Sequence, residues 1–577
     1  MWHKIQSQSL LLQKNRFTFE PSITNKKSMK KTILSAVFIF IVATIAYSQS
    51  SNREFRESCT SIMVGKKASV DGSVMTSHTC DGRYRSWMSI VPAQNHERGD
   101  VTKILKGTLF TESPDEIAQI QREGANYKKP ENIIFHDDFE VALEVKGEIP
   151  EVEQTFAFLY TAYPCMNEKN LAIGETTIEG RSELVNENGM FYIEELERIA
   201  LQRCSTARQA IVLMGELVKQ YGYADLGECL TLADKNEVWH FEIFGEGPEN
   251  IGGVWAAQRI PDDHVGVSAN ISRIGEIDLN DPDHFMASEN VLDVARKSGY
   301  WDGESTFKFW KAYGDDKPFS LREWFVLSSV APSLHLSIDA EELPFSVKAE
   351  KLLSAQDVLQ FFRETYEGTE YDMTKNLLMK RKKQDSDEME MVKSPYAQPW
   401  LSNNMIAAFN AIKDSTVNRV RCIAVPQCAY AHVIQIRGWL PDEIACVAYI
   451  SNDNPAQSPR IPFYSNILQT PGPFHLSGHK RYTTDAAAWT YRQANKLASI
   501  RWEELRGKIE KPRDDFEAKM FAEQNRIDSE AVKRFNEEGE QAGREFLTKY
   551  LSDFAEETLN TWQELGDELW YVFIRGL

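Results

Sequence analysis

The feature that most constrains the fold is a pair of strand signals that begins with a cysteine. Residues 56–82 read RESCTSIMVGKKASVDGSVMTSHTCDG. The β-branched and apolar positions predict strands over residues 60–64 and 73–77, and the polar segment between them predicts the turn of a hairpin. Cys59 therefore stands at the very start of a β-hairpin.

An apolar segment precedes this hairpin. Residues 29–48, MKKTILSAVFIFIVATIAYS, combine a positive start, an apolar run and small residues at cleavage-site spacing. The run is shorter than the ~18 residues that a membrane-spanning helix needs. We interpret residues 29–48 as a secretory signal peptide, residues 1–28 as an upstream extension outside the fold, and residues 49–58 as a pro-segment. The mature protein is expected to be secreted or periplasmic, with no membrane span.

The composition argues against some classes of binding partner. The chain has a formal net charge of −20 and 42% hydrophobic residues, which is typical of a globular protein. Nucleic acid or an anionic membrane would require a basic patch, and the sequence has none. A small neutral or zwitterionic substrate fits the charge better. Residues 380–393 mix both signs of charge and predict a solvated loop.

Strand and helix signals alternate along the rest of the chain. Helical spacing covers residues 191–203 and 355–366, and Ser205 is expected to cap a helix that ends at Gly222. From residue 485 onward the pattern is almost wholly helical. Strand clusters that alternate with helix pairs predict an α+β fold of sheets covered by helices. The strand signals lie at residues 151–162, 171–177, 229–233, 238–244, 265–269, 421–426, 432–438 and 444–450. An apolar stripe in the helical tail is expected to pack on the main body, with a second subunit as the alternative, and it consists of Trp562, Leu565, Leu569 and Trp570.

The cysteine at the start of the hairpin could carry nucleophilic chemistry. A cysteine is a good nucleophile only as the thiolate, so a neighbouring base must take its proton. The base can be a histidine elsewhere in the chain. It can also be the α-amino group of Cys59 itself, with a reference pKa of about 7.7–8.0, if the chain is cleaved immediately before this residue. A buried structural cysteine is the alternative interpretation.

The residues around Cys59 resemble a known family. CTSIMVGKKASVDGSVM is similar to the mature start of the cysteine-type N-terminal-nucleophile (Ntn) dipeptidases of bacteria. Similar blocks follow in the family's order at residues 167–177, 193–223, 233–245, 254–274 and 440–465, so the resemblance extends to about residue 502. It implies a four-layer αββα sandwich over residues 59–484, with residues 485–577 as a helical extension packed on it.

The resemblance also implies catalytic roles. The Cys59 Sγ would attack the peptide carbonyl, its α-amine would shuttle the proton, and water would release a thioester acyl-enzyme. Asp81 falls where related enzymes have an aspartate that contacts the amine and thiol of the nucleophile. Asn270 and Thr176 match positions of oxyanion donors. Each of these residues also has a purely structural alternative. Asp81 could be a turn residue, Asn270 could end its strand, and Thr176 could be a packed strand residue.

One departure from the family lies at the end of the hairpin. The family commonly has Arg-Asn-Glu-Asp there, whereas this chain has His78, Thr79, Cys80 and Asp81. Histidine lacks the permanent charge and the planar donor fork of arginine at neutral pH. Either the basic role is met elsewhere or substrate choice has shifted. We assign His78 and Glu175 to the substrate-binding site, with a buried polar residue as the alternative for His78.

These observations predict a secreted cysteine dipeptidase that needs no metal or organic cofactor. The sequence has neither an HExxH nor a CxxC motif, and His240 with Glu242 is interpreted as a solvated strand face. The expected partner is a dipeptide substrate, and a homo-oligomer is left open. One alternative is an Ntn amidase of N-acyl amino acids or conjugated bile salts, similar to penicillin V acylase. The other is a secreted binding protein of the same fold that has lost turnover.

Overall fold

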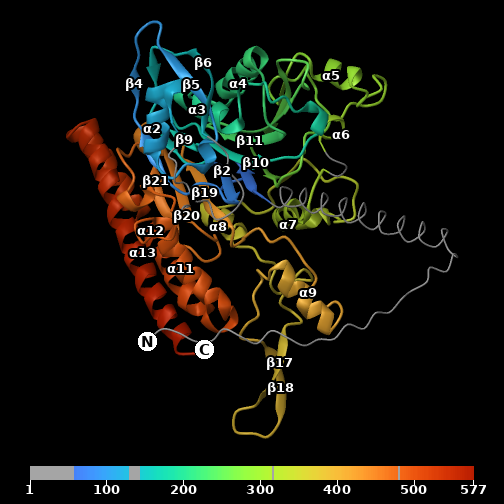
Figure 1. Ribbon diagram of the computed structural model, residues 1–577, viewed down its shortest axis with the longest axis vertical. Helices are drawn as coiled ribbons and strands as arrows, with labels where there is room; N and C mark the ends of the chain where they lie inside the picture. Colours follow the sequence, from blue (N-terminus) through green and yellow to red (C-terminus); the bar gives the residue numbers. More distant parts are fainter. Residues whose placement is uncertain (1–57, 129–142, 315–317, 479–480, 577) are drawn as a thin grey trace, which may run out of the picture. The chain divides into compact units, whose positions relative to one another are not determined.

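The computed structural model describes residues 58–128, 143–314, 318–478 and 481–576. The expected upstream extension (residues 1–28), the signal peptide (residues 29–48) and the pro-segment up to residue 57 lie outside the described residues. Two antiparallel sheets form the centre of the described part, and most of their strands are fully buried. Figure 1 shows these sheets with helices around them.

The first sheet contains the predicted hairpin at its middle. Its seven strands are antiparallel to their neighbours, and the hairpin strands β1 and β2 lie between β14 and β19. In order across the sheet, the strands are β16 (Ser346–Lys348), β14 (His264–Ser268), β1 (Ser61–Val64), β2 (Val74–Asp81), β19 (Cys428–Ile436), β20 (Cys446–Asn452) and β21 (Ile461–Tyr464).

The second sheet has eight strands and includes the predicted strands around residues 171–177 and 229–244. In order across the sheet, the strands are β15 (Phe285–Ala287), β13 (Gly253–Ile260), β12 (Val238–Gly245), β11 (Gly227–Ala233), β10 (Ala172–Thr177), β9 (Met166–Asn167), β8 (Phe158–Tyr160) and β3 (Ser89–Val91).

The two sheets pack on each other through β2, β10 and β11. The Thr76 hydroxyl on β2 donates to the Thr231 carbonyl on β11 at 3.0 Å. A side chain at Gly174 would collide with the Ser77 carbonyl, so glycine permits the close approach of β10 to β2. Helices α3 (Ile193–Arg203) and α4 (Ala207–Tyr221) contact the second sheet from its other side. This mixed α/β arrangement with antiparallel sheets confirms the predicted fold class in its coarser form.

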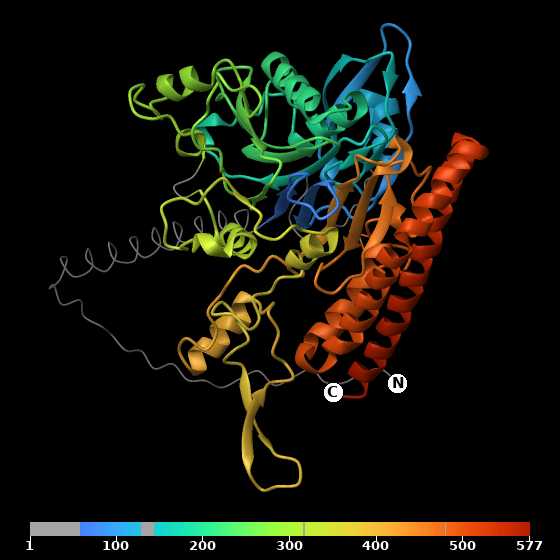
Figure 2. The ribbon, with the colours of Figure 1, turned by 180° about the vertical axis from the view of Figure 1, so that it is seen from behind.

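Three long helices form the C-terminal region, as predicted. They are α11 (Ala487–Ile500), α12 (Trp502–Glu537) and α13 (Glu540–Ile574), which pack on one another and on β20 and β21 (Figures 1 and 2). In the predicted apolar stripe, Trp562 and Leu569 are buried, and Trp562 contacts the Tyr491 ring. The expectation was wrong for Trp570, which is 48% exposed near the end of α13.

A buried ion pair joins α12 to the first sheet. Arg437 Nη1 lies 2.5 Å from Asp528 Oδ2, and the Tyr464 hydroxyl donates to Asp528 Oδ1 at 2.8 Å. Removing one partner of such a pair leaves an uncompensated buried charge. We expect Asp528→Ala to lower the free energy of unfolding by about 3–5 kcal/mol, measured by urea denaturation.

The matched control for Asp528→Ala is Asp553→Ala, which breaks the exposed pair with Lys549 on α13. This change is expected to cost about 0.5 kcal/mol or less, because water screens exposed pairs. Equal effects of the two substitutions would contradict a stabilising role for the buried pair.

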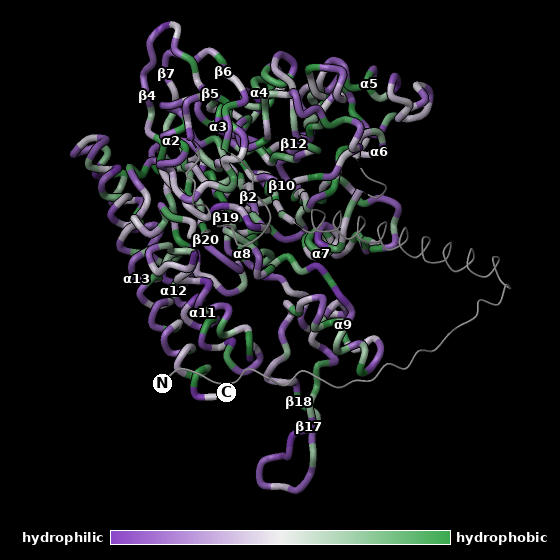
Figure 3. Tube along the Cα trace, viewed as in Figure 1, coloured by the Kyte–Doolittle hydropathy of each residue, from purple (hydrophilic) through white to green (hydrophobic). Residues whose placement is uncertain are grey.

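Several local predictions differ from the structure. Residues 421–426 form no strand, because this segment runs irregularly toward the start of the hairpin. The cap of α4 is Thr206 rather than Ser205, and its hydroxyl accepts a hydrogen bond from the Gln209 amide. Residues 380–393 are largely solvent-exposed as predicted, but they pair as the β17–β18 hairpin with a hydrophilic loop (Figure 3).

Shorter elements complete the described chain. Among the described residues, no helix is both long and apolar enough to cross a membrane. All eight cysteines are buried free thiols. The remaining helices are α2 (Pro114–Glu123), α5 (Val291–Lys297), α6 (Phe309–Tyr313), α7 (Leu321–Val330), α8 (Ala355–Phe361), α9 (Asn403–Ile412) and α10 (Asp442–Ala445). The remaining strands are β4 (Gln94–Asn95), β5 (Val101–Lys106), β6 (Glu144–Pro150), β7 (Gln154–Thr155), β17 (Leu378–Lys382) and β18 (Met389–Lys393).

Candidate active site

Hydroxyl side chains of β2 fix the start of the hairpin. The Thr60 amide donates to the Thr79 hydroxyl at 2.9 Å, and the Ile62 amide donates to the Ser77 hydroxyl at 2.8 Å. These bonds satisfy backbone donors of the short strand β1 that would otherwise be buried without partners. They hold Cys59, which directly precedes this segment and is fully buried.

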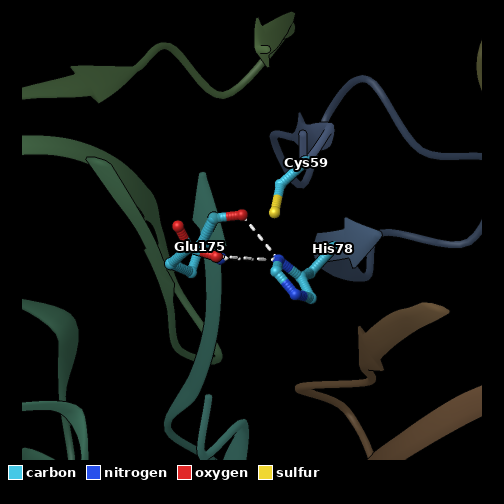
Figure 4. A group of neighbouring side chains, drawn as sticks. All are labelled: Cys59, His78 and Glu175. Carbon is cyan, nitrogen blue, oxygen red and sulfur yellow. Dashed lines mark hydrogen bonds and ion pairs between the residues drawn. The ribbon is translucent and has the colours of Figure 1, made fainter. Parts of the chain in front are cut away.

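Three buried side chains meet at this point (Figure 4). The Cys59 sulfur, a ring nitrogen of His78 and a carboxylate oxygen of Glu175 lie within 4.8 Å of one another. They come from the segment just before β1, from β2 and from β10 of the other sheet. His78 Nδ1 lies 2.5 Å from the Glu175 carbonyl oxygen and 3.6 Å from its Oε2 atom. The two residues that we assigned to substrate binding thus lie beside the predicted nucleophile.

Burial controls the protonation of all three groups. It raises the pKa of the Cys59 thiol, and the carboxylates of Glu175 and Asp81 raise it further, so the thiol is protonated. Burial lowers the pKa of His78 to about 4, which leaves the imidazole neutral and a weak base. Burial raises the pKa of Glu175 to about 7, although hydrogen bonds from Thr177 and Cys59 oppose this shift. Glu175 can therefore accept a proton near neutral pH.

Asp81 is linked to the nucleophile through an arginine. Arg421 Nη2 donates to Asp81 Oδ2 at 2.7 Å, and the Thr79 hydroxyl donates to the same oxygen at 2.8 Å. The same Arg421 nitrogen also donates to the Ser58 carbonyl, in the peptide group that joins Ser58 to Cys59. The Ser58 hydroxyl donates to the Asp81 carbonyl at 2.9 Å.

A second arginine connects Asn270 to the same peptide. Arg322 Nη1 donates to the Cys59 carbonyl at 2.6 Å and to the Ser58 carbonyl at 3.3 Å, while Nη2 donates to Asn270 Oδ1 at 2.9 Å. Burial lowers the pKa of Arg322 to about 10, so it stays charged at neutral pH. Asn270 has a left-handed backbone with φ of 63°, which asparagine tolerates better than most residues. Its amide nitrogen donates to the Thr177 carbonyl at 2.7 Å.

Thr176 faces a different set of groups. Its hydroxyl lies 2.6 Å from the Ser268 hydroxyl, which donates to the Cys229 sulfur at 3.3 Å. The His240 ring continues this buried network, with Nε2 3.4 Å from Cys229 Sγ and 2.7 Å from Glu242 Oε1. The interpretation of His240 and Glu242 as a solvated face was wrong, because both are fully buried between the sheets.

Arg322 and Arg421 are site residues that the sequence did not indicate. Ser320 and Glu323 form a capping box, which signals the start of α7 and places Arg322 in its first turn. Nothing in the local pattern indicates that the two arginines reach the Ser58–Cys59 segment, since both contacts join residues more than 260 positions apart. Together they supply the permanent positive charge that His78 lacks.

The three central donors also have the chemical types of a metal site. Thiolate, imidazole and carboxylate are common zinc ligands. In this structure, His78 Nδ1 is hydrogen-bonded to the Glu175 backbone. The same three side chains also have the chemical types of a nucleophile and its neighbours.

Comparisons with known proteins identify the family. Residues 58–515 match the model of peptidase family C69. A probable dipeptidase of Latilactobacillus sakei is 27% identical over 420 residues, covering 71% of this chain and 75% of the relative. A probable dipeptidase B of Streptococcus pyogenes serotype M1 is 22% identical, covering 92% of this chain and 94% of the relative. A probable dipeptidase of Salmonella dublin is 25% identical over 71% of this chain and 81% of its own length. With most of its length matched, the chain belongs to peptidase family C69, a family of cysteine peptidases.

Proposed function

We propose that the protein hydrolyses dipeptides through a thioester on Cys59, after cleavage of its own Ser58–Cys59 peptide bond. The observation that carries this proposal is the pair of arginine contacts to the Ser58 carbonyl, directly beside the thiol. Donors aimed at a carbonyl oxygen stabilise the negative charge that develops when the carbon is attacked. The relatives named as probable dipeptidases support the substrate class.

Self-cleavage would begin with the thiol. The Glu175 carboxylate takes the thiol proton, and the sulfur attacks the Ser58 carbonyl carbon. The bond from this carbon to the Cys59 nitrogen then breaks as that nitrogen gains a proton, and a thioester forms. Water hydrolyses the thioester, which releases the Ser58 carboxylate and restores the thiol. The product has Cys59 as its first residue, with a free α-amine.

Peptide hydrolysis would use this new α-amine as the base, because His78 is a weak base and the surroundings of Cys59 keep the thiol protonated. The sulfur attacks the dipeptide carbonyl, and the amine passes the proton to the leaving nitrogen. Water then attacks the thioester and releases the first amino acid. Asp81, held by Arg421, is proposed to orient the amine, and Asn270 to donate to the oxyanion.

We also propose a layer order for the fold and a cellular location for the protein. Helices on both outer sides of two packed sheets support a four-layer αββα sandwich of the Ntn type. The signal-peptide character of residues 29–48 supports export from the cytoplasm.

Two measurements test the proposed function. Mass spectrometry of the purified active protein is expected to find Cys59 at the amino terminus. Incubation with a panel of free dipeptides is expected to release amino acids, whereas penicillin V and a conjugated bile salt are expected to remain intact. Turnover of only these last two compounds would favour the amidase alternative, and an active protein that retains Ser58 would contradict the mechanism.

A further inference from the structure

A pair of buried acids adjoins the nucleophile. Glu228 on β11 lies opposite Thr177 of β10, and Glu175 is two residues from Thr177 on the same face. Glu175 and Glu228 are thus diagonal cross-strand neighbours, and burial, followed by the Glu175 carboxylate, raises the pKa of Glu228. Both side chains are almost fully buried, yet the Oε2 atom of each has no hydrogen-bond partner.

Unpartnered carboxylate oxygens in a protein interior are costly unless a cation or donor arrives. In the described part of the chain, neither Glu175 nor Glu228 forms an ion pair with a lysine or arginine. The raised pKa of Glu228 leaves this residue protonated, so the pair carries only the negative charge of Glu175, which the neutral His78 imidazole does not balance. The two Oε2 atoms form a polar site that lacks a positive ligand.

The distance from the sulfur identifies which part of a substrate this site can reach. In an amino acid, the α-nitrogen lies about 2.5 Å from the carbonyl carbon. An attacking sulfur approaches that carbon to about 3–3.5 Å. The α-ammonium of the bound substrate is therefore no more than about 6 Å from the sulfur. The Glu175 carboxylate oxygen lies within 4.8 Å of the same sulfur, so it can accept an ammonium hydrogen bond of about 2.8 Å.

We propose that Glu175 and Glu228 form the subsite that binds the free α-ammonium group of the substrate's first residue. This inference rests on the proposed function and adds the feature that directs cleavage to the first peptide bond of the substrate. A longer peptide that placed an internal bond at the sulfur would bring an uncharged amide and further chain against the two acids. An N-acyl substrate would bring an acyl group there, with no positive charge.

Kinetics with a matched pair of substrates test the subsite. The value of kcat/KM is measured for a free dipeptide and for the same dipeptide acetylated at its α-nitrogen. Wild type, Glu228→Gln and Glu246→Gln are compared. Glu246 is the control acid, because it hydrogen-bonds to Asn290 at the edge of the second sheet and lies outside the site. Mass spectrometry verifies that each protein begins at Cys59.

Wild type is expected to prefer the free dipeptide by at least about 100-fold, and Glu246→Gln to behave like wild type. Glu228→Gln is expected to lose at least about tenfold in kcat/KM for the free dipeptide, because an approaching ammonium favours the ionised form of Glu228 and glutamine cannot form that charge-assisted hydrogen bond. Its kcat/KM for the acetylated dipeptide should change little. An equal loss of kcat/KM on both substrates would assign Glu228 a structural role. Wild-type kcat/KM of Glu228→Gln on both substrates would also overturn the inference. In either case the dipeptidase proposal would stand. Wild type without dipeptide turnover would overturn both.

Discussion

Cys59→Ala is expected to abolish both the cleavage before residue 59 and the hydrolysis of dipeptides. The two reactions share one nucleophile, and alanine has no atom that can form the thioester. The neighbouring His78 imidazole is engaged with the Glu175 backbone. Mass spectrometry should find the chain uncleaved at Ser58, and amino acid release from dipeptides should fall to the background rate.

Two further variants make the Cys59 result specific. Cys59→Ser should cleave and hydrolyse much more slowly, because a hydroxyl is a poorer nucleophile than a thiol near neutral pH. Cys446→Ala removes another buried free thiol, on β20, and should retain both reactions. The decisive contrary result is turnover by a Cys59→Ala protein that has been trimmed correctly, because another residue would then be the nucleophile.

The elements next to Cys59 were predictable because their signals are local. Strand alternation identified β1, β2, β11 and β12, and helical spacing identified α3 and α4. The segment at residues 421–426 carries a false strand signal, because its apolar residues satisfy a strand pattern while its backbone forms no ladder. Arg421 in that segment takes its position from Asp81 and Ser58, and no window of neighbouring residues contains that information.

The candidate site likewise has features that the sequence indicated and features that depend on packing. The resemblance to a family indicated Cys59, and the structure brings His78 and Glu175 to it. Burial, which the sequence does not report, decides how these groups behave. The alternating pattern of His240 and Glu242 fits a solvent-exposed strand face as well as a buried hydrogen-bond network. Only the packing of the second sheet distinguishes these two arrangements. Glu228 went unnoticed because its partner, Glu175, is on another strand.

Arg421→Gln is expected to slow self-cleavage by about 10²–10³-fold, the usual cost of losing one donor to an oxyanion. Arg421 donates to the Ser58 carbonyl and to Asp81 Oδ2 through the same nitrogen, so it couples the scissile peptide to the aspartate. Arg421→Lys keeps the charge but lacks the planar fork, and an intermediate rate is expected. The rate is measured as the loss of uncleaved chain with time by mass spectrometry.

The control for Arg421 must separate chemistry from stability, because Arg421→Gln also leaves Asp81 buried without its cation. Arg437→Gln provides this control, since Arg437 forms a similar buried pair with Asp528 at the contact with α12. Both glutamine variants should unfold at lower temperature than wild type. Only Arg421→Gln should cleave slowly at a temperature where both are folded. If the two variants cleave at the same rate, Arg421 acts through stability, and the charge that stabilises attack on Ser58 must come from another group, of which Arg322 is the nearest on the same carbonyl.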